Sequence, residues 1–309
     1  MTDPTVALQR RALVGVLLTV TMWGANVVLL KALLGSTNAE TINVGRFVIA
    51  GSVLVALSVR AHGWPRWDAT TWLAVAVVGF LGNTLFQAFF LTAIRANPAG
   101  VGGLVTGIVP VLVLPLGLLL GQKVSGRQTA GVGVAFAGLL GLLAVTLQPG
   151  AHVTLSGLGW VLAAAGAWAG YTLFNRPLTA QLGALPFVAF SLLLGCLPYL
   201  LWAVPHLHDL NRLAPLTVLG IVVSALGANV LAYLAWANGT NILGAARTAV
   251  WNTLAPAVAL LLSAAVLHER LPTAVWLAAG VILLGAALAN WPEQKKRAQE
   301  TATSPRPEL

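Results

Sequence analysis

The chain has 309 residues, of which 58% are hydrophobic and only 8% are charged, and its mean hydropathy is +0.86. In soluble domains about a quarter of the residues are charged, so this composition excludes a water-soluble enzyme or binding module and indicates a protein of the lipid bilayer. In a soluble protein, a net charge of +9 would suggest that the partner is a nucleic acid. In a membrane protein, the distribution of the positive charges instead indicates which side of the membrane each connection lies on, so no nucleic-acid partner is expected.

Apolar runs of about 20 residues, enough to cross roughly 30 Å of hydrocarbon as helix, follow one another along the whole chain. Ten are found, at about 12–34, 41–60, 69–92, 99–120, 128–147, 156–174, 182–203, 214–236, 244–267 and 273–291. A membrane barrel would show short alternating segments instead. We therefore predict an all-α polytopic membrane protein with ten transmembrane helices. The first run is too long for a signal sequence and lacks a clear cleavage site, so it is expected to remain as a helix.

The basic residues divide unevenly between the two sides that ten crossings define. With the N-terminus inside, the connections and tails on the cytoplasmic side hold Arg10, Arg11, Arg60, Arg66, Lys123, Arg127, Arg176, Lys295, Lys296, Arg297 and Arg306. The opposite side holds Lys31, Arg95, Arg212 and Arg270. The positive-inside rule then predicts a multi-pass protein of the cell inner (plasma) membrane with both termini in the cytoplasm.

Landmarks in the first half of the chain recur about 146 residues later. The stretch "TGIVP" at 106–110 returns as "NTLAP" at 252–256, and Trp23 corresponds to Trp168 and Gly138 to Gly285. This spacing indicates a duplicated five-helix unit, and because five is odd the second copy enters the membrane from the opposite side. Inverted repeats of this kind are typical of transporters. The expected organisation is a cytoplasmic N-terminus (1–11), a first repeat (12–148), a linker (149–155), a second repeat (156–291) and a disordered cytoplasmic tail (292–309).

The order and duplication of several motifs resemble the EamA family of the drug/metabolite transporter superfamily. These motifs are "WGAN" at 23–26, an arginine early in the second run, and "NPAG" at 97–100 and "NILG" at 241–244, each followed by a helix proline. The resemblance covers almost the whole chain. It implies a ten-helix metabolite exporter in which the fifth and tenth helices lie outside the substrate pathway.

The two mid-helix prolines predict hinges next to a polar region. Pro110 and Pro256 leave the carbonyl groups of Thr106 and Asn252 without their helical donors. Such a break is tolerated in a bilayer where protein groups or cavity water supply a donor, so both helices are expected to bend there and to face a central cavity. The alternative is that prolines are common in membrane helices and have no functional role here.

Polar and aromatic side chains at one-turn spacing share a helix face in several runs. If these faces converge with the broken helices, they form a cavity that can hydrogen-bond and stack a small polar or aromatic molecule. The expected substrate-binding residues are Trp23, Asn26, Asn83, Gln87, Thr106, Trp168, Tyr171, Asn229, Tyr233, Trp251 and Asn252. The alternative for each polar residue is an interhelical hydrogen bond that only stabilises packing.

Two arginines lie inside apolar runs, where a charge is costly. Arg46 and Arg247 can escape this cost by extending toward opposite membrane surfaces. The functional alternative is that they lie at opposite mouths of the pathway and attract a substrate carboxylate or phosphate.

Every acidic residue and every histidine falls in a connection or a tail, so no run offers an embedded group for proton coupling. Facilitated diffusion or exchange is therefore expected, and an enzyme is not, since no paired carboxylates, phosphate loop or metal-ligand cluster is present and no metal or cofactor is expected. The interpretation is a carrier that exports a small metabolite by alternating access, with amino acids or related compounds, aromatic ones included, preferred by the resemblance. A passive channel or a structural membrane subunit is the alternative. Substrate identity, flux direction and oligomeric state stay open.

Overall fold

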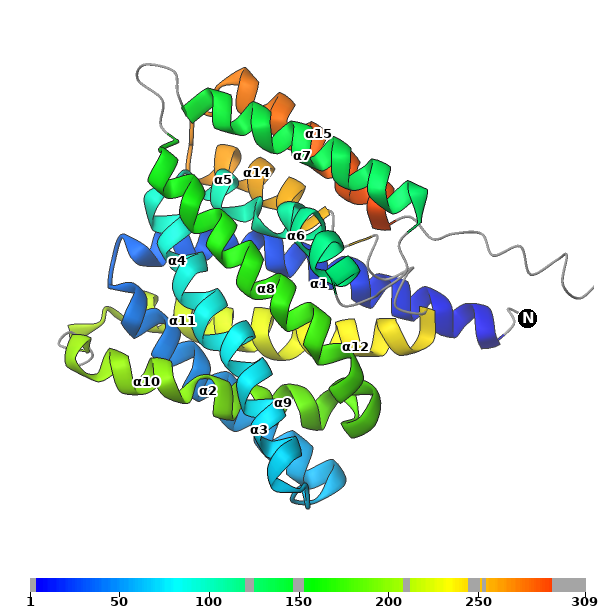
Figure 1. Ribbon diagram of the computed structural model, residues 1–309. Coiled ribbons are helices and arrows are strands. Elements are labelled where there is room, and N and C mark those ends of the chain that lie inside the picture. Colours follow the sequence, from blue (N-terminus) through cyan, green and yellow to red (C-terminus); the bar gives the residue numbers. More distant parts are fainter. Residues whose placement is uncertain are drawn as a thin grey trace, which may run out of the picture.

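The structure, a computed structural model, describes residues 4–119, 125–146, 153–207, 212–243, 251 and 254–290. All regular secondary structure in these residues is helical (Figure 1). Within them, seven helical stretches are long and apolar enough to cross a membrane, and two shorter apolar helices cover 254–266 and 273–289. The prediction of an all-helical membrane protein is thus confirmed, while the count of ten spans stays a prediction.

The first half of the chain alternates long helices with short breaks. Its elements are α1 (Pro4–Leu34), α2 (Ala39–His62), α3 (Ala69–Gly79), the π-helix η1 (Phe80–Leu85), α4 (Phe86–Ala96), α5 (Ala99–Gly103), α6 (Val105–Leu119) and α7 (Gly126–Thr146). Side-chain caps set two of the starts: Asn38 Oδ1 accepts from the Thr41 N–H at 2.7 Å and Asp68 Oδ1 from the Thr71 N–H at 3.0 Å. The hydrogen bonds from Thr71 lower the pKa of the exposed Asp68 carboxyl.

The second half follows the same plan. Its elements are α8 (Leu155–Leu182), α9 (Ala184–Gly195), α10 (Leu197–Ala203), the 3₁₀ turn η2 (Val204–His206), α11 (Pro215–Ser224), the π-helix η4 (Ala225–Leu231), α12 (Ala232–Leu243), α14 (Leu254–Val266) and α15 (Thr273–Asn290).

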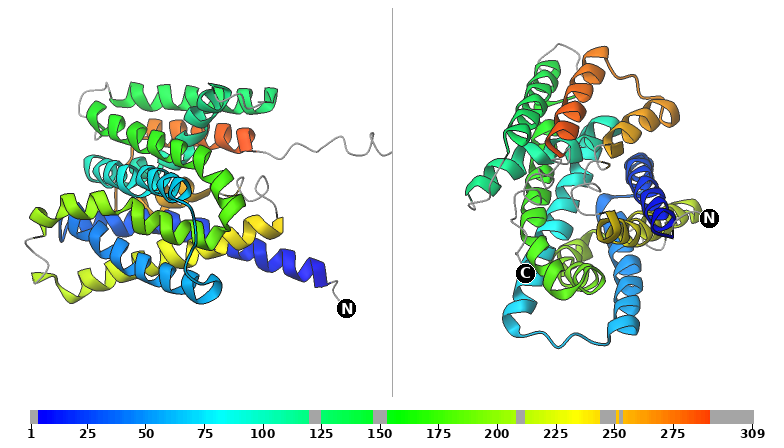
Figure 2. Two further views of the ribbon diagram at one scale, coloured as in Figure 1. Left: turned by 60° about the horizontal axis from the view of Figure 1, so that its bottom comes forward. Right: turned by 90° about the vertical axis from the view of Figure 1, so that its right-hand side faces the viewer.

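The main helix pairs each join one half of the chain to the other. Helix α1 packs on α12 and α14, and α8 packs on α4 and α6 in the corresponding way. Helix α2 lies against α9, and α7 lies along α15 at the edge of the bundle (Figures 1 and 2). One buried apolar cluster includes Leu30, Ile94 and Leu104, and a second is centred on Phe47 and Phe190. The two halves therefore share one interior.

Glycines allow α7 and α15 to approach backbone to backbone. A methyl group on Gly131 would stand 2.3 Å from the Ala289 nitrogen, and one on Gly285 would stand 2.2 Å from the Ala135 nitrogen. Small residues at such contacts are typical of membrane helix pairs, because close approach increases dispersion and carbonyl contacts where no hydrophobic effect operates between helices.

Two π-helical turns, which the sequence analysis did not predict, occupy corresponding places in the two halves. The turn η1 interrupts the helix from 69 to 96, and η4 interrupts the helix from 215 to 243, 145 residues further on. A π-turn inserts one extra residue per turn and rotates the faces on either side of it, and such turns often occur at functional sites. Asn83 and Asn229 lie in these turns.

The helix of the fourth apolar run is interrupted, but on the N-terminal side of its proline and not at the proline itself. The helix changes direction at Leu104, between α5 and α6, whereas Pro110 lies inside α6. Proline disturbs only the turn directly before its ring, so this break is not explained by Pro110. The sequence of α5, AGVGG, is rich in glycine, which weakens a helix. Pro256 is buried in the first described turn of α14, and a methyl group on Gly107 would stand 3.7 Å from Pro256 Cγ. The two proline-bearing helices therefore meet at this point.

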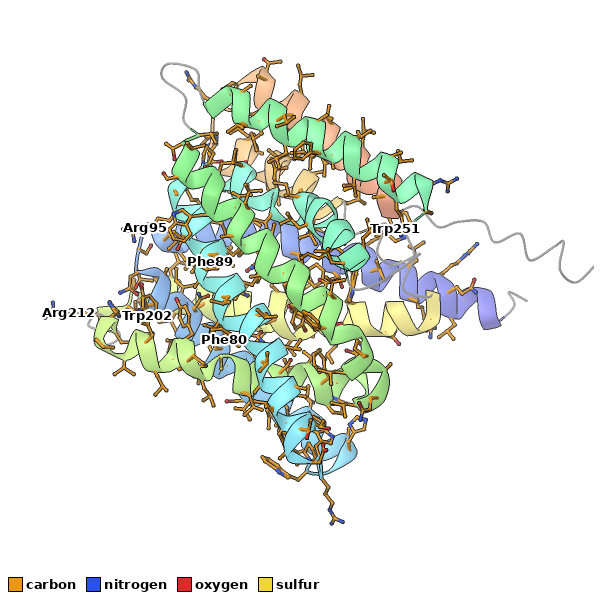
Figure 3. The ribbon with its side chains drawn as sticks, viewed as in Figure 1. Phe80, Phe89, Arg95, Trp202, Arg212 and Trp251 are labelled. Carbon is orange, nitrogen blue, oxygen red and sulfur yellow. The ribbon has the colours of Figure 1, made fainter. Side chains whose placement is uncertain are left out.

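Polar groups join several helix connections at one end of the bundle. Lys31 Nζ donates to the carbonyl oxygens of Ile94 at 2.7 Å and Asn97 at 2.6 Å, and Glu269 Oε1 accepts from the Ala99 N–H at 2.8 Å. Asn38 donates to the carbonyl of His206 at 2.8 Å. Figure 3 shows Arg95 and Arg212 at this same end. Lys31, Arg95 and Arg212, which were assigned to the non-cytoplasmic side, thus lie at one end of the bundle.

Candidate substrate cavity

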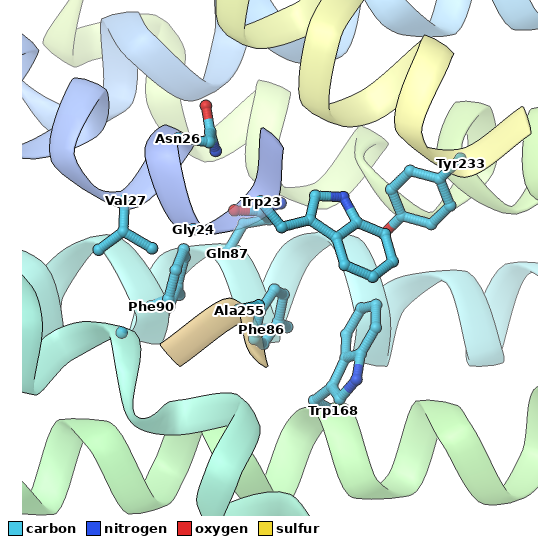
Figure 4. Close-up of a pocket in the computed structure, with 11 residues that line it drawn as sticks. Trp23, Gly24, Asn26, Val27, Phe86, Gln87, Phe90, Trp168, Tyr233 and Ala255 are labelled. Atoms are coloured by element: carbon cyan, nitrogen blue, oxygen red, sulfur yellow. The ribbon is translucent and has the colours of Figure 1, made fainter. Parts of the chain in front are cut away.

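A cavity of about 80 Å³ lies inside the bundle, where helices from both halves meet. Its walls come from α1, α4, α5, α8, α12 and α14 (Figure 4). The lining residues are Trp23, Gly24, Asn26, Val27, Phe86, Gln87, Phe90, Gly103, Trp168, Tyr233 and Ala255. Helices α7 and α15 contribute none of them.

Aromatic rings form most of the cavity wall. The Trp23 ring lies 5.7 Å from the Tyr233 ring in an edge-on arrangement, and Trp23 Nε1 donates to the carbonyl of Ala228 in η4 at 3.0 Å. On the other wall, the Trp168 ring lies 4.7 Å from the Phe86 ring, which stacks on Phe90 at 5.1 Å. Figure 4 shows Trp168 rising from α8 toward the indole of Trp23. The cavity can therefore present ring faces to a bound molecule from two sides.

Two amide side chains supply the polar part of the wall. Asn26 is buried and its Oδ1 accepts a hydrogen bond from the Ser224 hydroxyl at 2.6 Å, which holds the side chain in one orientation. Gln87 Oε1 accepts from Arg46 Nη1 at 3.3 Å. Each cavity amide is thus positioned by a residue from a neighbouring helix.

Arg46 lies in the interior, which corrects both expectations for it. Its side chain is only 2% exposed, so it neither extends to the membrane surface nor stands at a pathway mouth. Its guanidinium donates to Asn43 Oδ1 at 3.1 Å, Gln87 Oε1 at 3.3 Å and Asn229 Oδ1 at 3.0 Å. Because helices α2, α4 and η4 surround it with amide oxygens, burial is tolerated where lipid exposure would be more costly.

Four further predicted site residues lie outside the cavity wall. Asn83 Nδ2 donates to the backbone carbonyls of Gly79 at 2.9 Å and Ser191 at 3.1 Å, so it ties η1 to α9. Asn229 holds Arg46, and buried Tyr171 lies behind Trp168 with ring centroids 5.0 Å apart. Trp251 is half-buried and is not among the residues that line the cavity. One-turn spacing predicted that polar side chains share one face of a helix. It did not predict whether the cavity or another helix lies against that face.

The remaining predicted residues lie wholly or partly outside the part of the chain that the structure describes. Arg247 and Asn252 lie outside the described residues, as do the tail from 292 onward and most of the linker, 149–152. The backbone of Thr106 and Pro110 belongs to α6, but their side chains are outside the description. Their proposed roles stay predictions.

Several lining residues were not predicted. Phe86 and Phe90 sit one turn apart on the face that carries Gln87, and Gly24 belongs to the "WGAN" stretch, so their spacing was a usable signal. No such signal in the sequence marked Gly103 and Ala255, because small residues in apolar runs usually indicate close helix–helix packing. They show that α5 and the proline-bearing helix α14 reach the cavity.

A bundle of apolar helices around a cavity walled by rings and amides is the arrangement expected of a helical membrane transporter. The model of the EamA-like transporter family matches residues 10–144 and again residues 155–291. The chain belongs to this family.

Relatives with similar lengths fit this membership. A protein of Salmonella typhimurium named "Probable amino-acid metabolite efflux pump" is 27% identical over 285 residues, covering 89% of this chain and 92% of that protein. The "Probable terminal-alkyne amino-acid exporter" of Streptantibioticus cattleyicolor is 26% identical, covering 91% and 93%. A crystallographically solved chain with 21% identity superposes with a TM-score of 0.60 over 92% of this chain and 97% of its own, which shows a shared fold.

Proposed function

We propose that this protein exports a small amino-acid-like metabolite across the plasma membrane by alternating access around the cavity. The observation that carries the proposal is the cavity itself, in which Trp23, Trp168 and Tyr233 offer ring faces and Asn26 and Gln87 offer amides. The printed names of two relatives, an amino-acid metabolite efflux pump and an amino-acid exporter, support the substrate class.

The mechanism rests on an inverted repeat of residues 12–148 and 156–291. The family model matches twice, π-turns recur 145 residues apart, and the packing of α1 on α12 and α14 has its counterpart in α8 on α4 and α6. Two equivalent halves that exchange conformations open the cavity to each side in turn. Pro110 and Pro256, in the helices α6 and α14 that touch each other, permit the bending.

Substrate movement is proposed to proceed by facilitated diffusion or exchange. The cavity wall, as described, carries amides and rings but no carboxylate or imidazole. The cavity residues would therefore orient the substrate without exchanging a proton with it.

The proposal is tested by counterflow of each of the common amino acids in proteoliposomes. Trp168→Ala removes a cavity wall and should reduce counterflow at least about tenfold, and Trp168→Phe should reduce it less and alter the preference among substrates. Trp160→Ala is the matched control, because Trp160 lies on the same helix α8 but is 39% exposed and outside the cavity. Equal effects of the two alanine variants, or unitary ion currents in place of counterflow, would support a structural subunit or a channel instead.

A further inference from the structure

The buried arginine next to the cavity carries a charge that its surroundings do not neutralise. Arg46 is held by the neutral amide oxygens of Asn43, Gln87 and Asn229. The described carboxylates, Glu40, Asp68 and Glu269, lie at helix starts or in the connection after α14. Neutral acceptors offset part of the cost of burying a guanidinium, but the charge itself remains available to an anion.

One donor of the same guanidinium is unused. Arg46 Nε is buried without a hydrogen-bond partner. Buried polar atoms are nearly always paired, so this guanidinium keeps hydrogen-bonding capacity beyond its three amide acceptors. Guanidinium donors form a planar fork that matches the two oxygens of a carboxylate.

A single side chain separates this charge from the cavity. Gln87 lines the cavity and its Oε1 accepts from Arg46 Nη1 at 3.3 Å, which is long for a bond to a charged donor. Rotation of the Gln87 amide would open Nη1 to a molecule in the cavity. A carboxylate in its place gives a shorter, charge-assisted bond.

We propose that Arg46 binds the carboxylate of the transported molecule, which replaces Gln87 Oε1 as the acceptor of Nη1. The inference rests on the proposed export function and specifies its substrate class as free carboxylic acids. The rest of the molecule contacts the rings of Trp23, Trp168 and Phe86, and an amino group, where present, lies on their faces. The carboxylate is thus required, while the amino group is replaceable.

Four probes that differ in these two groups test the assignment by thermal shift and calorimetric titration of the purified protein. They are L-phenylalanine, 3-phenylpropionate, which lacks the amine, L-phenylalaninamide, which has an amide in place of the carboxylate, and phenethylamine, which keeps the amine but has neither a carboxylate nor an amide. The two acids should bind about 10- to 100-fold more tightly than the amide and the amine, the range of a charged hydrogen bond.

Substitutions at the guanidinium then locate the preference. Arg46→Gln should abolish the preference of acid over amide, and Arg46→Lys should retain part of it because the charge stays. Arg95→Gln is the matched control, since Arg95 is an exposed arginine at the end of α4 and its loss should leave the preference unchanged.

Two results overturn the inference: equal affinity of the wild type for acid and amide, or an undiminished preference in Arg46→Gln. Failure of all four probes to bind also overturns it. If neither Arg46 variant folds, the wild-type ratio of acid to amide affinity decides alone. The proposed export function is judged separately by the counterflow of the common amino acids, which can succeed when the carboxylate assignment fails.

Discussion

At the scale of single residues, the cavity depends on side chains that position other side chains. Asn26 faces the cavity, yet its orientation comes from the Ser224 hydroxyl of α11, and Gln87 is held by Arg46 of α2. When a buried acceptor loses its donor, the fold is destabilised by the free energy of desolvating that acceptor, which no hydrogen bond then offsets. Residues outside the wall therefore influence the orientation of the amides that line the cavity.

Removing the donor to Asn26 should lower stability. Ser224→Ala leaves the buried Asn26 Oδ1 unpaired, and we expect a decrease of about 1 to 3 kcal/mol in the free energy of unfolding. The measurement is denaturant unfolding in detergent. Thr21→Val is the control, because the exposed Thr21 hydroxyl bonds only to the carbonyl of Leu17 in its own helix. A Ser224→Ala protein as stable as this control would show that the hydrogen bond makes no net contribution.

At the scale of helices, α7 and α15 form a pair outside the cavity whose contact depends on glycine. The two helices approach so closely that a side chain at Gly131 or Gly285 would meet the partner's backbone, which cannot move aside as a flexible side chain can. In the same helix, Gly133 has open space around it. The two positions form a natural pair for comparison.

Gly131→Ala and Gly133→Ala should therefore change stability in opposite directions. The methyl group at 131 would stand 2.3 Å from the Ala289 nitrogen, so the helices must separate, at a cost of about 1 to 3 kcal/mol. At 133 the methyl group only raises helix propensity, by up to about 1 kcal/mol. Unfolding midpoints of both variants in one detergent provide the test. Equal midpoints would mean that the α7–α15 contact is looser than the structure has it.

At the scale of the whole molecule, the connections between helices gather at opposite ends. Lys31, Asn97 and Glu269 interact at one end, and Arg95 and Arg212 lie there too (Figure 3). The positive-inside rule assigns this end, with its few basic residues, to the outside.

Cysteine labelling tests this orientation. In a Cys196→Ser background, a membrane-impermeant maleimide should label Arg212→Cys in intact cells, but Arg66→Cys only after permeabilisation. Both positions are exposed, so accessibility within the protein does not distinguish them. The reverse pattern would place both termini outside the cell.

The sequence by itself determined the features that depend on local composition and order. Long continuous apolar runs indicate a bilayer and helices, because a barrel strand would alternate apolar and polar residues, and the recurrence near 146 residues links the two halves. Trp23, Asn26, Gln87, Trp168 and Tyr233 were selected by one-turn spacing and line one cavity. Their role in binding a substrate stays a prediction.

Only the tertiary structure decided which polar groups face the cavity and which hold helices together. Asn83 and Asn26 are both amides in apolar runs, but Asn83 bonds to backbone carbonyls across the η1–α9 contact while Asn26 reaches the cavity. The π-turns rotate faces that a regular helix would present elsewhere, and Arg46 is buried because three other helical residues provide its acceptors. Helical periodicity defines a face, but the partner of that face is chosen by packing between segments far apart in the chain.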